Sequence, residues 1–468
     1  MTTAVSEKTL QNTVLLMVLL NAFTTPLTLS AANVALPTIA DDLVMSAVAL
    51  GWVPMAYLMA SAMFVLPFGG LADRIGRKRV FLLGTAAVIA SSVMAALAMN
   101  APMLLTARFL QGVSAAMLYA TQLAIVSSVF PAQRRGQIVG LVVSSIYVGL
   151  ATGPLLGGLM IDLFGWRSAF LLQVPLAIVV LLIGVFKVNG EWSADRKTPF
   201  DSVGAMTYSG SILLLCLAVS RLPAVDGLLL LAGGTISMLL FVRHALRIPF
   251  PIWDIRLFFT NRVFTLSCAA SLIMYSATYA NVVLISLFLQ YLKGMSASQA
   301  GMIMMLQPLC MAVLSPLTGR LSDRIEPRVL ASVGMAVTAL GLLMLARLDS
   351  GSSVTVIVLA LLMTGAGFAL FSSPNVNAIM GSVLPQQLGS ASGAVATTRL
   401  LGQLTSMVLV SLMLTMAMGD TAIDPASYPL LEQTIRNSFG LAAALCIPGI
   451  LLSMVRGRIH TSTVKETP

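Results

Sequence analysis

Long apolar runs repeat along this entire chain, and they limit it to one kind of fold. A helix of roughly 20 apolar residues crosses the hydrocarbon core of a bilayer. The 468-residue sequence holds fourteen such runs, separated mostly by short polar connections. Only 9% of the residues are charged, whereas a water-soluble chain carries roughly 25% charged residues. The sequence therefore predicts an all-α, polytopic membrane protein with about fourteen transmembrane helices and no soluble domain.

The first run is too long for the apolar stretch of a signal peptide, which spans roughly 7–15 residues. We therefore expect it to remain as an uncleaved first helix. The expected spans are 12–37, 46–70, 79–99, 101–126, 137–161, 168–187, 202–220, 224–243, 262–290, 296–319, 328–347, 353–380, 390–418 and 436–456.

Basic residues indicate how these helices are oriented. If both termini are cytoplasmic, twenty of the 27 Lys and Arg fall in cytoplasmic connections and tails, and five fall in outer connections. Membrane proteins concentrate Lys and Arg in their cytoplasmic loops. We therefore predict a multi-pass protein of the cell inner membrane with both termini cytoplasmic. The net charge of +10 does not indicate nucleic-acid binding, because the basic residues form no patch with interleaved aromatics.

A polar loop occurs twice, once after the second expected helix and once after the tenth. Residues 70–79 read GLADRIGRKR and residues 319–328 read GRLSDRIEPR, with Glu326 where the first copy has a glycine. Two parallel repeats with a binding site between them are a known plan of secondary transporters. We predict an N-terminal six-helix bundle at 1–190, two extra helices with linkers at 191–261 and a C-terminal six-helix bundle at 262–468.

Three motifs in this order resemble those of the major facilitator superfamily. Residues 70–79 are similar to its signature loop, G-x-L-a-D-r-x-G-r-k. Residues 108–112 (RFLQG) resemble its R-x-x-q-G motif, and residues 149–158 (GLATGPLLGG) resemble the G-x-x-x-G-P-x-x-G-G motif of its exporters. The resemblance covers nearly the whole chain and implies the major facilitator fold in a 6+2+6 arrangement of helices.

Three further segments are typical of the fourteen-helix drug:proton antiporters within this superfamily, namely 33–37 (NVALP), 200–204 (FDSVG) and 389–393 (GSASG). This resemblance implies a multidrug-efflux-like secondary transporter that exports small amphipathic compounds by alternating access and is coupled to protons.

The chain departs from this family at the position of the usual helix-one aspartate, which is Thr28 here. All 17 Asp and Glu fall in loops, tails or span ends, and both histidines lie at cytoplasmic helix ends. Proton relays inside membranes use buried Asp, Glu or His. The alternative is therefore an uncoupled or otherwise coupled exporter or facilitator of a specific metabolite or lipid-like molecule. Further alternatives are coupling through Asp73 or Asp42 and coupling through a substrate that itself carries charge.

Residues expected to control the conformational change lie in the first polar loop, in its second copy and in the fifth helix. In the resembling family the loop ties the two halves together, and we expect Asp73 to face a helix N-terminus, where the dipole stabilises a negative charge by roughly 0.3–1 kcal/mol. Glycines spaced by four let another helix approach closely, and Pro154 favours a bend. The alternatives are charges that only set topology and ordinary packing of small residues. The predicted gating residues are Gly70, Asp73, Arg74, Gly76, Arg77, Gly149, Gly153, Pro154, Gly157 and Asp323.

Two arginines fall within expected helices. A charge at that depth costs about 2.5–3.5 kcal/mol and usually faces a cavity. Arg108 lies near the outer third of its helix, where it can partly reach the interface, and Arg399 lies deeper. Neutral, amphipathic or anionic substrates fit these arginines better than cations do. Each polar candidate has helix packing as its alternative role. The predicted substrate-binding residues are Thr28, Asn33, Arg108, Gln122, Tyr275, Tyr279, Asn281, Gln307, Asn375, Arg399 and Gln403.

The remaining function classes lack their chemistry in this sequence. A membrane hydrolase needs acid, base or nucleophile inside the bilayer, and an ATP-driven pump needs a G-x-x-x-x-G-K-[ST] loop, which is absent. The four cysteines lie in apolar runs without paired spacing and indicate neither disulfides nor a metal site. We predict a non-enzymatic monomer without cofactor, whose partners are the lipid bilayer, a small-molecule substrate and, if the family coupling holds, protons.

Overall fold

The computed structural model describes residues 2–192, 199–222, 224–322, 324–384, 387–419 and 423–457. The elements that these residues form are helices. Fourteen helical stretches are long and apolar enough to cross a membrane, beginning with Lys8–Val34 and ending with Tyr428–Val455. The prediction of an all-helical protein with fourteen spans is therefore confirmed.

The first eight spans are formed by nine helices, and a tenth, α2, lies between the first two spans. They are α1 (Thr2–Val34), α2 (Leu36–Leu43), α3 (Ala47–Ile75), α4 (Arg77–Ala96), α5 (Ala101–Val129), α6 (Ala132–Phe164), α7 (Arg167–Leu171), α8 (Val174–Phe186), α9 (Ser202–Arg221) and α10 (Val225–Arg247).

The last six spans follow a short helix, α11 (Leu257–Thr260). They are formed by α12 (Arg262–Thr278), α13 (Asn281–Leu287), the π-helical segment η1 (Phe288–Leu292), α14 (Ala297–Met304), α15 (Leu306–Leu321), α16 (Pro327–Leu345), α17 (Val354–Gly381), α18 (Leu388–Met418) and α19 (Tyr428–Val455).

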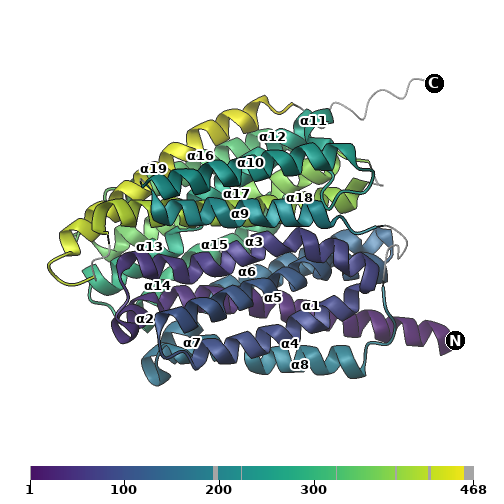
Figure 1. Ribbon diagram of the computed structural model, residues 1–468, viewed down its shortest axis with the longest axis horizontal. Helices are drawn as coiled ribbons and strands as arrows, with labels where there is room; N and C mark the ends of the chain where they lie inside the picture. Colours follow the sequence, from purple (N-terminus) through teal and green to yellow (C-terminus); the bar gives the residue numbers. More distant parts are fainter. Residues whose placement is uncertain are drawn as a thin grey trace.

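The first six spans and the last six lie side by side as two groups of helices. In Figure 1, α1–α8 fill the lower part of the view and α12 and α16–α19 the upper part, while α13–α15 reach down to α2 and α6 at the left. Helix α9 packs against α10, against α3 of the first group and against α18 of the last. The hydroxyl of Tyr208 on α9 donates a 3.0 Å hydrogen bond to the Ala62 carbonyl on α3. Of the two extra spans, α9 therefore contacts both groups, and the division at 190 and 261 stays a prediction.

The molecule has two ends along the helix axes. Helix α1 begins at the end where α19 finishes, at the right of Figure 1, and we name this end the terminus side. The other end holds α2 and the connection between α6 and α7, and we name it the opposite side.

At the opposite side the two groups pack closely. A Cβ added to Gly158 of α6 would meet the Ala297 carbonyl of α14, and one added to Gly301 would meet the Pro154 carbonyl. Asp162 accepts hydrogen bonds of 3.0 Å from the Ser296 hydroxyl and from the Ser298 amide. Small residues let helices approach to backbone contact. The structure is therefore closed at this side.

Candidate functional site

Arg108 is buried between the helices of the first group, with a side chain only 1% exposed. Its Nε donates to the Val53 carbonyl at 3.1 Å and its Nη1 to Gln111 at 2.8 Å. The guanidinium also lies 4.8 Å above the ring of Tyr57. Among the residues that the structure describes, none gives the Nη2 atom a hydrogen bond. The expectation that Arg108 partly reaches the interface is wrong, because these contacts hold it inside the protein.

A network behind Arg108 fixes the orientation of its partner. The amide nitrogen of Gln111 donates to the Ser92 hydroxyl at 3.0 Å, and that of Gln173 donates to the same oxygen at 2.6 Å. The Gln111 amide oxygen is thereby turned toward Arg108. Two sides of the guanidinium are anchored, and its remaining nitrogen is left for another partner.

Arg399 of α18 approaches Arg108 from the other group of helices. Its guanidinium lies 5.6 Å from the ring centre of Tyr119 on α5. The Tyr119 hydroxyl is 3.2 Å from that of Tyr57, whose ring carries Arg108. Arg399 is only partly buried, and it has no hydrogen-bond or ion-pair partner among the described residues. The two arginines therefore flank a pair of tyrosines at the boundary between the two groups.

Tyrosines of the ninth span complete this site. The ring of Tyr275 packs edge-on against Phe368 with 5.3 Å between centroids, and Arg399 lies within electrostatic reach of Tyr275. Tyr279 lies within such reach of Arg108, and its hydroxyl faces the Asn33 side chain. We name this set the central cluster. Its members are Tyr57, Arg108, Tyr119, Tyr275, Tyr279 and Arg399.

Four other predicted substrate-binding residues are buried or partly buried outside the central cluster. Thr28 and Asn33 of α1 are buried, the Thr28 hydroxyl has no partner, and Asn33 lies beside Tyr279. Gln307 is buried on α15, and Gln403 is partly buried on α18. Their roles as substrate contacts stay predictions.

Three further candidates make contacts within one group of helices. Gln122 accepts a 2.7 Å hydrogen bond from Asn21, and Asn375 accepts one from Arg456. Asn281 lines a small cavity of about 20 Å³ between α13, α18 and α19. In this conformation these side chains join helices inside a bundle, and the central cluster does not include them.

Acidic residues in the described spans lie near span ends, as Asp73, Asp162, Asp226 and Glu432 do. Asp42, just beyond the first span, accepts hydrogen bonds of 2.9 Å from the Trp166 indole and from Arg167. These bonds, with Trp166 the larger cause, lower the pKa of the Asp42 carboxyl below its ordinary value of 3.8. Asp42 therefore stays ionised near neutral pH. Among the described residues, no group of three His, Cys, Asp or Glu is placed to hold a metal.

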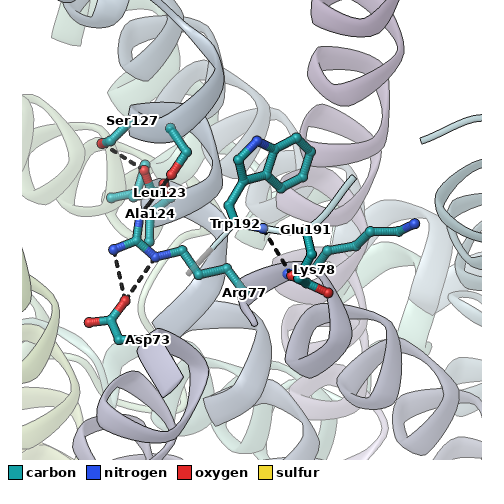
Figure 2. Close-up of polar contacts among 9 residues, drawn as sticks. Asp73, Arg77, Lys78, Leu123, Ala124, Ser127, Glu191 and Trp192 are labelled. Atoms are coloured by element: carbon teal, nitrogen blue, oxygen red, sulfur yellow. Dashed lines mark hydrogen bonds and ion pairs between the residues drawn. The ribbon is translucent and has the colours of Figure 1, made fainter. Parts of the chain in front are cut away.

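The loop at 70–79 is held from two directions, as Figure 2 shows. Asp73 pairs with Arg77 at 2.7 Å, and Arg77 also donates to the Ala124 carbonyl on α5 at 3.2 Å. The amide of Lys78 at the start of α4 donates to the Glu191 carboxylate at 2.8 Å. Asp73 lies in the last turn of α3, and Glu191 is the acid that accepts the amide at the start of α4. That Asp73 faces a helix N-terminus stays a prediction.

The remaining gating candidates surround this loop. Gly76 has φ +115°, and a Cβ there would overlap Glu191. Gly70 lies beside Phe200 and Ile252 of the linkers, and Arg74 is partly buried in the last turn of α3. Asp323, in the second copy of the loop, lies outside the described residues.

The spaced glycines of α6 face α1. A Cβ on Gly149 would meet the Phe23 carbonyl, one on Gly153 would lie 2.6 Å from the Leu27 carbonyl, and one on Gly157 would lie 2.6 Å from Ala31. The same helix contacts the last group through Gly158 and Pro154. Helix α6 thus packs against α1 along one face and against α14 near its far end.

Comparisons with known proteins agree with this architecture. The sequence pattern of the Major Facilitator Superfamily matches residues 18–402 and 266–467. The multidrug resistance protein Stp of Mycobacterium tuberculosis is 33% identical over 79% of this chain and 70% of its own length. The riboflavin transporter RibZ of Clostridioides difficile is 28% identical over 94% of this chain and 96% of its own length.

Solved structures agree on the fold. The human organic anion transporter MFSD10 superimposes with a TM-score of 0.60 at 17% identity, over 96% of this chain and 99% of the other. The peptide transporter POT superimposes with a TM-score of 0.68 at 15% identity, over 94% of this chain and 93% of the other. This chain is a membrane transporter of the Major Facilitator Superfamily, similar to the fourteen-span multidrug efflux pumps.

Proposed function

We propose that this transporter exports small amphipathic compounds from the cell by alternating access. The observation that carries the proposal is the central cluster, where buried and partly buried tyrosines link Arg399 to Arg108 at the boundary between the two groups of helices. A boundary site near the middle of the membrane is where parallel repeats of secondary transporters bind substrate. Relatives named multidrug resistance protein and drug efflux pump support export as the direction.

We further propose that the terminus side is cytoplasmic, which the distribution of the 27 Lys and Arg supports. The close contacts at the opposite side would then make this the inward-facing form. Loop 70–79 would act as the gate of the terminus side, with Asp73 free to exchange Arg77 for a partner across the boundary when that side closes. Asp73→Asn is then expected to slow transport at unchanged surface expression, and unchanged transport would contradict the gate.

Of the two coupling schemes, the described spans favour the one without proton antiport. A buried proton carrier needs a titratable group deep in the membrane. Asp73, Asp162, Asp226 and Glu432 lie near span ends, and Asp42 is held in its ionised form by Trp166. The relative named a riboflavin transporter supports a specific metabolite as a second candidate substrate.

Reconstitution into liposomes tests both parts of the proposal. Purified full-length protein is assayed with a panel of labelled amphiphiles and riboflavin, with and without an imposed pH gradient. We expect flux of at least one compound at a rate that the gradient leaves unchanged. Absence of flux for the whole panel would contradict export of amphiphiles, and flux that reverses with the gradient would restore proton antiport.

A further inference from the structure

We propose that the substrate is an organic anion with a planar aromatic part, held between the guanidinium groups of Arg108 and Arg399, and that the membrane potential drives its export. The inference rests on the export function proposed above. It adds the substrate class and the driving force.

The central cluster carries the positive charges of Arg108 and Arg399. Buried charges in proteins are paired with an opposite charge, because an unpaired charge loses its hydration without compensation. Arg108 is 1% exposed and its Nη2 has no partner, and no acid among the described residues pairs with Arg399. The acids of the described spans lie near span ends. The negative charge that these arginines need is therefore supplied by what binds between them.

Aromatic rings lie beside both guanidinium groups. Tyr57 and Tyr119 touch through their hydroxyls and each carries one guanidinium on its ring, at 4.8 Å for Arg108 and 5.6 Å for Arg399. A carboxylate or sulfonate accepts paired hydrogen bonds from a guanidinium fork. Aromatic and guanidinium faces stack on a flat ring. A small inorganic anion would use the charges but not the aromatic surfaces.

The Tyr279 hydroxyl faces the Asn33 side chain and, within electrostatic reach of Arg108, adds a donor there. A phenol donates to an anionic oxygen as readily as an amide does, so Tyr279 and Arg108 Nη2 can share one anionic group. Tyr279 belongs to the last group of helices and Arg108 to the first. A bound anion would therefore contact both groups, which is the placement that a moving boundary needs.

The acids of the described spans lie near span ends, so the described residues place no carboxylate deep in the membrane to carry a proton. An inside-negative membrane potential pushes a monovalent anion outward, and 100 mV corresponds to an equilibrium ratio of about 50-fold. An exporter of anions can therefore work without a titratable group in the membrane.

Binding of two charge-opposed probes tests the substrate class. Radiolabelled naphthalene-2-sulfonate and (2-naphthylmethyl)trimethylammonium share one ring system and keep their charges at every accessible pH. Equilibrium dialysis against the purified full chain should show saturable binding of the sulfonate and none of the ammonium. Arg399→Gln should weaken sulfonate binding at least about tenfold, because a charge-assisted hydrogen bond is lost. The control Arg221→Gln should leave it unchanged, since Arg221 is exposed and pairs with Asp226.

Sulfonate binding by Arg108→Gln is measured together with the thermal unfolding midpoint of this variant, because replacing a buried arginine can also unfold the protein. Where that variant does not fold, Arg399→Gln carries the test alone, since Arg399 is only partly buried. Saturable binding of the ammonium, absence of sulfonate binding, or equal sulfonate binding by wild type and Arg399→Gln would each overturn the substrate class.

Flux in proteoliposomes tests the driving force. A potassium gradient with valinomycin sets the potential, and the sulfonate should accumulate on the positive side toward about 50-fold per 100 mV. A pH gradient at zero potential should drive no accumulation. Accumulation that follows the pH gradient would overturn the driving force. Arginine-dependent binding without any flux would support the substrate class and contradict the export function, so the two failures are distinguishable.

Discussion

Asp42 shows at the scale of one residue how its neighbours decide what a carboxylate can do. Its oxygen accepts bonds from Trp166 and Arg167, and both partners favour the ionised form. The pKa of Asp42 therefore lies below 3.8 in the folded protein. The pair contributes stability that is fully present above the unfolded pKa and is lost as the pH falls through the lower folded value.

Replacing Asp42 by Asn should therefore have the same effect at about pH 5 and about pH 8. The Arg167–Asp42 pair is roughly half exposed, so we expect a loss of about 0.2–1 kcal/mol in the free energy of unfolding. Thermal unfolding in detergent measures it. The pH profile of transport should be unchanged between these pH values, and a shifted profile would make Asp42 the proton carrier that we exclude.

Gly76 is a second position where a single residue has a strong effect, here on the stability of the protein. Its φ of +115° and the overlap of any Cβ with Glu191 predict that Gly76→Ala destabilises the protein by about 1–3 kcal/mol. Gly69→Ala is the matched control, because no atom lies within 4 Å of a Cβ there and Gly69 is helical. Unfolding midpoints of the two variants test this, and equal midpoints would contradict the role of Glu191.

Sequence alone predicted Arg108 and Arg399, because a charge inside an apolar run stands out. Tyr275 and Tyr279 were predicted with them, whereas Tyr57 and Tyr119 were missed, since the sequence does not show which of the tyrosines in the spans face the boundary between the two groups. Glu191 was missed for a different reason. It lies in a linker more than 100 residues from Lys78, and only the folded chain brings that carboxylate to the start of α4.

At the scale of elements, α6 shows that spaced glycines serve packing within a group as well as between groups. Gly153→Ala should lower the free energy of unfolding by about 1–3 kcal/mol, because the added methyl group would lie 2.6 Å from the Leu27 carbonyl. Gly140→Ala on the same helix has nothing within 4 Å and should not destabilise. Chemical unfolding in detergent compares the two, and an equal loss would show that α1 and α6 pack differently.

The start of α9 explains the chemistry of the segment 200–204. Asp201 caps the helix through the Gly204 amide at 2.8 Å and also bonds the His244 ring of α10 at 2.8 Å. The side chain of Asp201 is 3% exposed, whereas that of Asp226, in the first turn of α10, is 51% exposed.

Asp201→Ala should therefore cost about 0.5–2 kcal/mol, the usual loss of an N-cap, and Asp226→Ala about 0–1 kcal/mol as an exposed pair. Differential scanning fluorimetry of both variants measures the difference. A loss from Asp226→Ala as large as that from Asp201→Ala would contradict the capping role.

The positions of the spans followed from apolar length, because each connection is polar. The breaks inside the ninth span were not predictable in this way. Between α12 and α13, at Tyr279 and Ala280, and again at η1, the backbone leaves the regular α-helix. Apolar composition continues through both places, so hydropathy carries no sign of them. The Ser406 hydroxyl accepts the Ala280 amide at 3.0 Å, which helps to satisfy the interrupted backbone.

At the scale of the whole molecule, the proposed export depends on alternating access. In this structure the groups meet at the opposite side through Asp162, Ser298 and the glycines beside them. Export requires this contact to open in every cycle. The conformation is a property of packing over two groups of helices, so the sequence could predict the repeat but not which side is closed.

A reversible lock between Asp162 and Ser298 tests this claim most directly. Asp162→Cys with Ser298→Cys is made in a chain whose four native cysteines are replaced, and flux is measured in proteoliposomes before and after oxidation. A second pair, Arg221→Cys with Asp226→Cys, joins neighbouring helices and serves as control. We predict that oxidation stops flux only for the first pair and that reduction restores it. Flux that is as fast after oxidation of the Asp162→Cys, Ser298→Cys protein as before it would contradict alternating access through this contact.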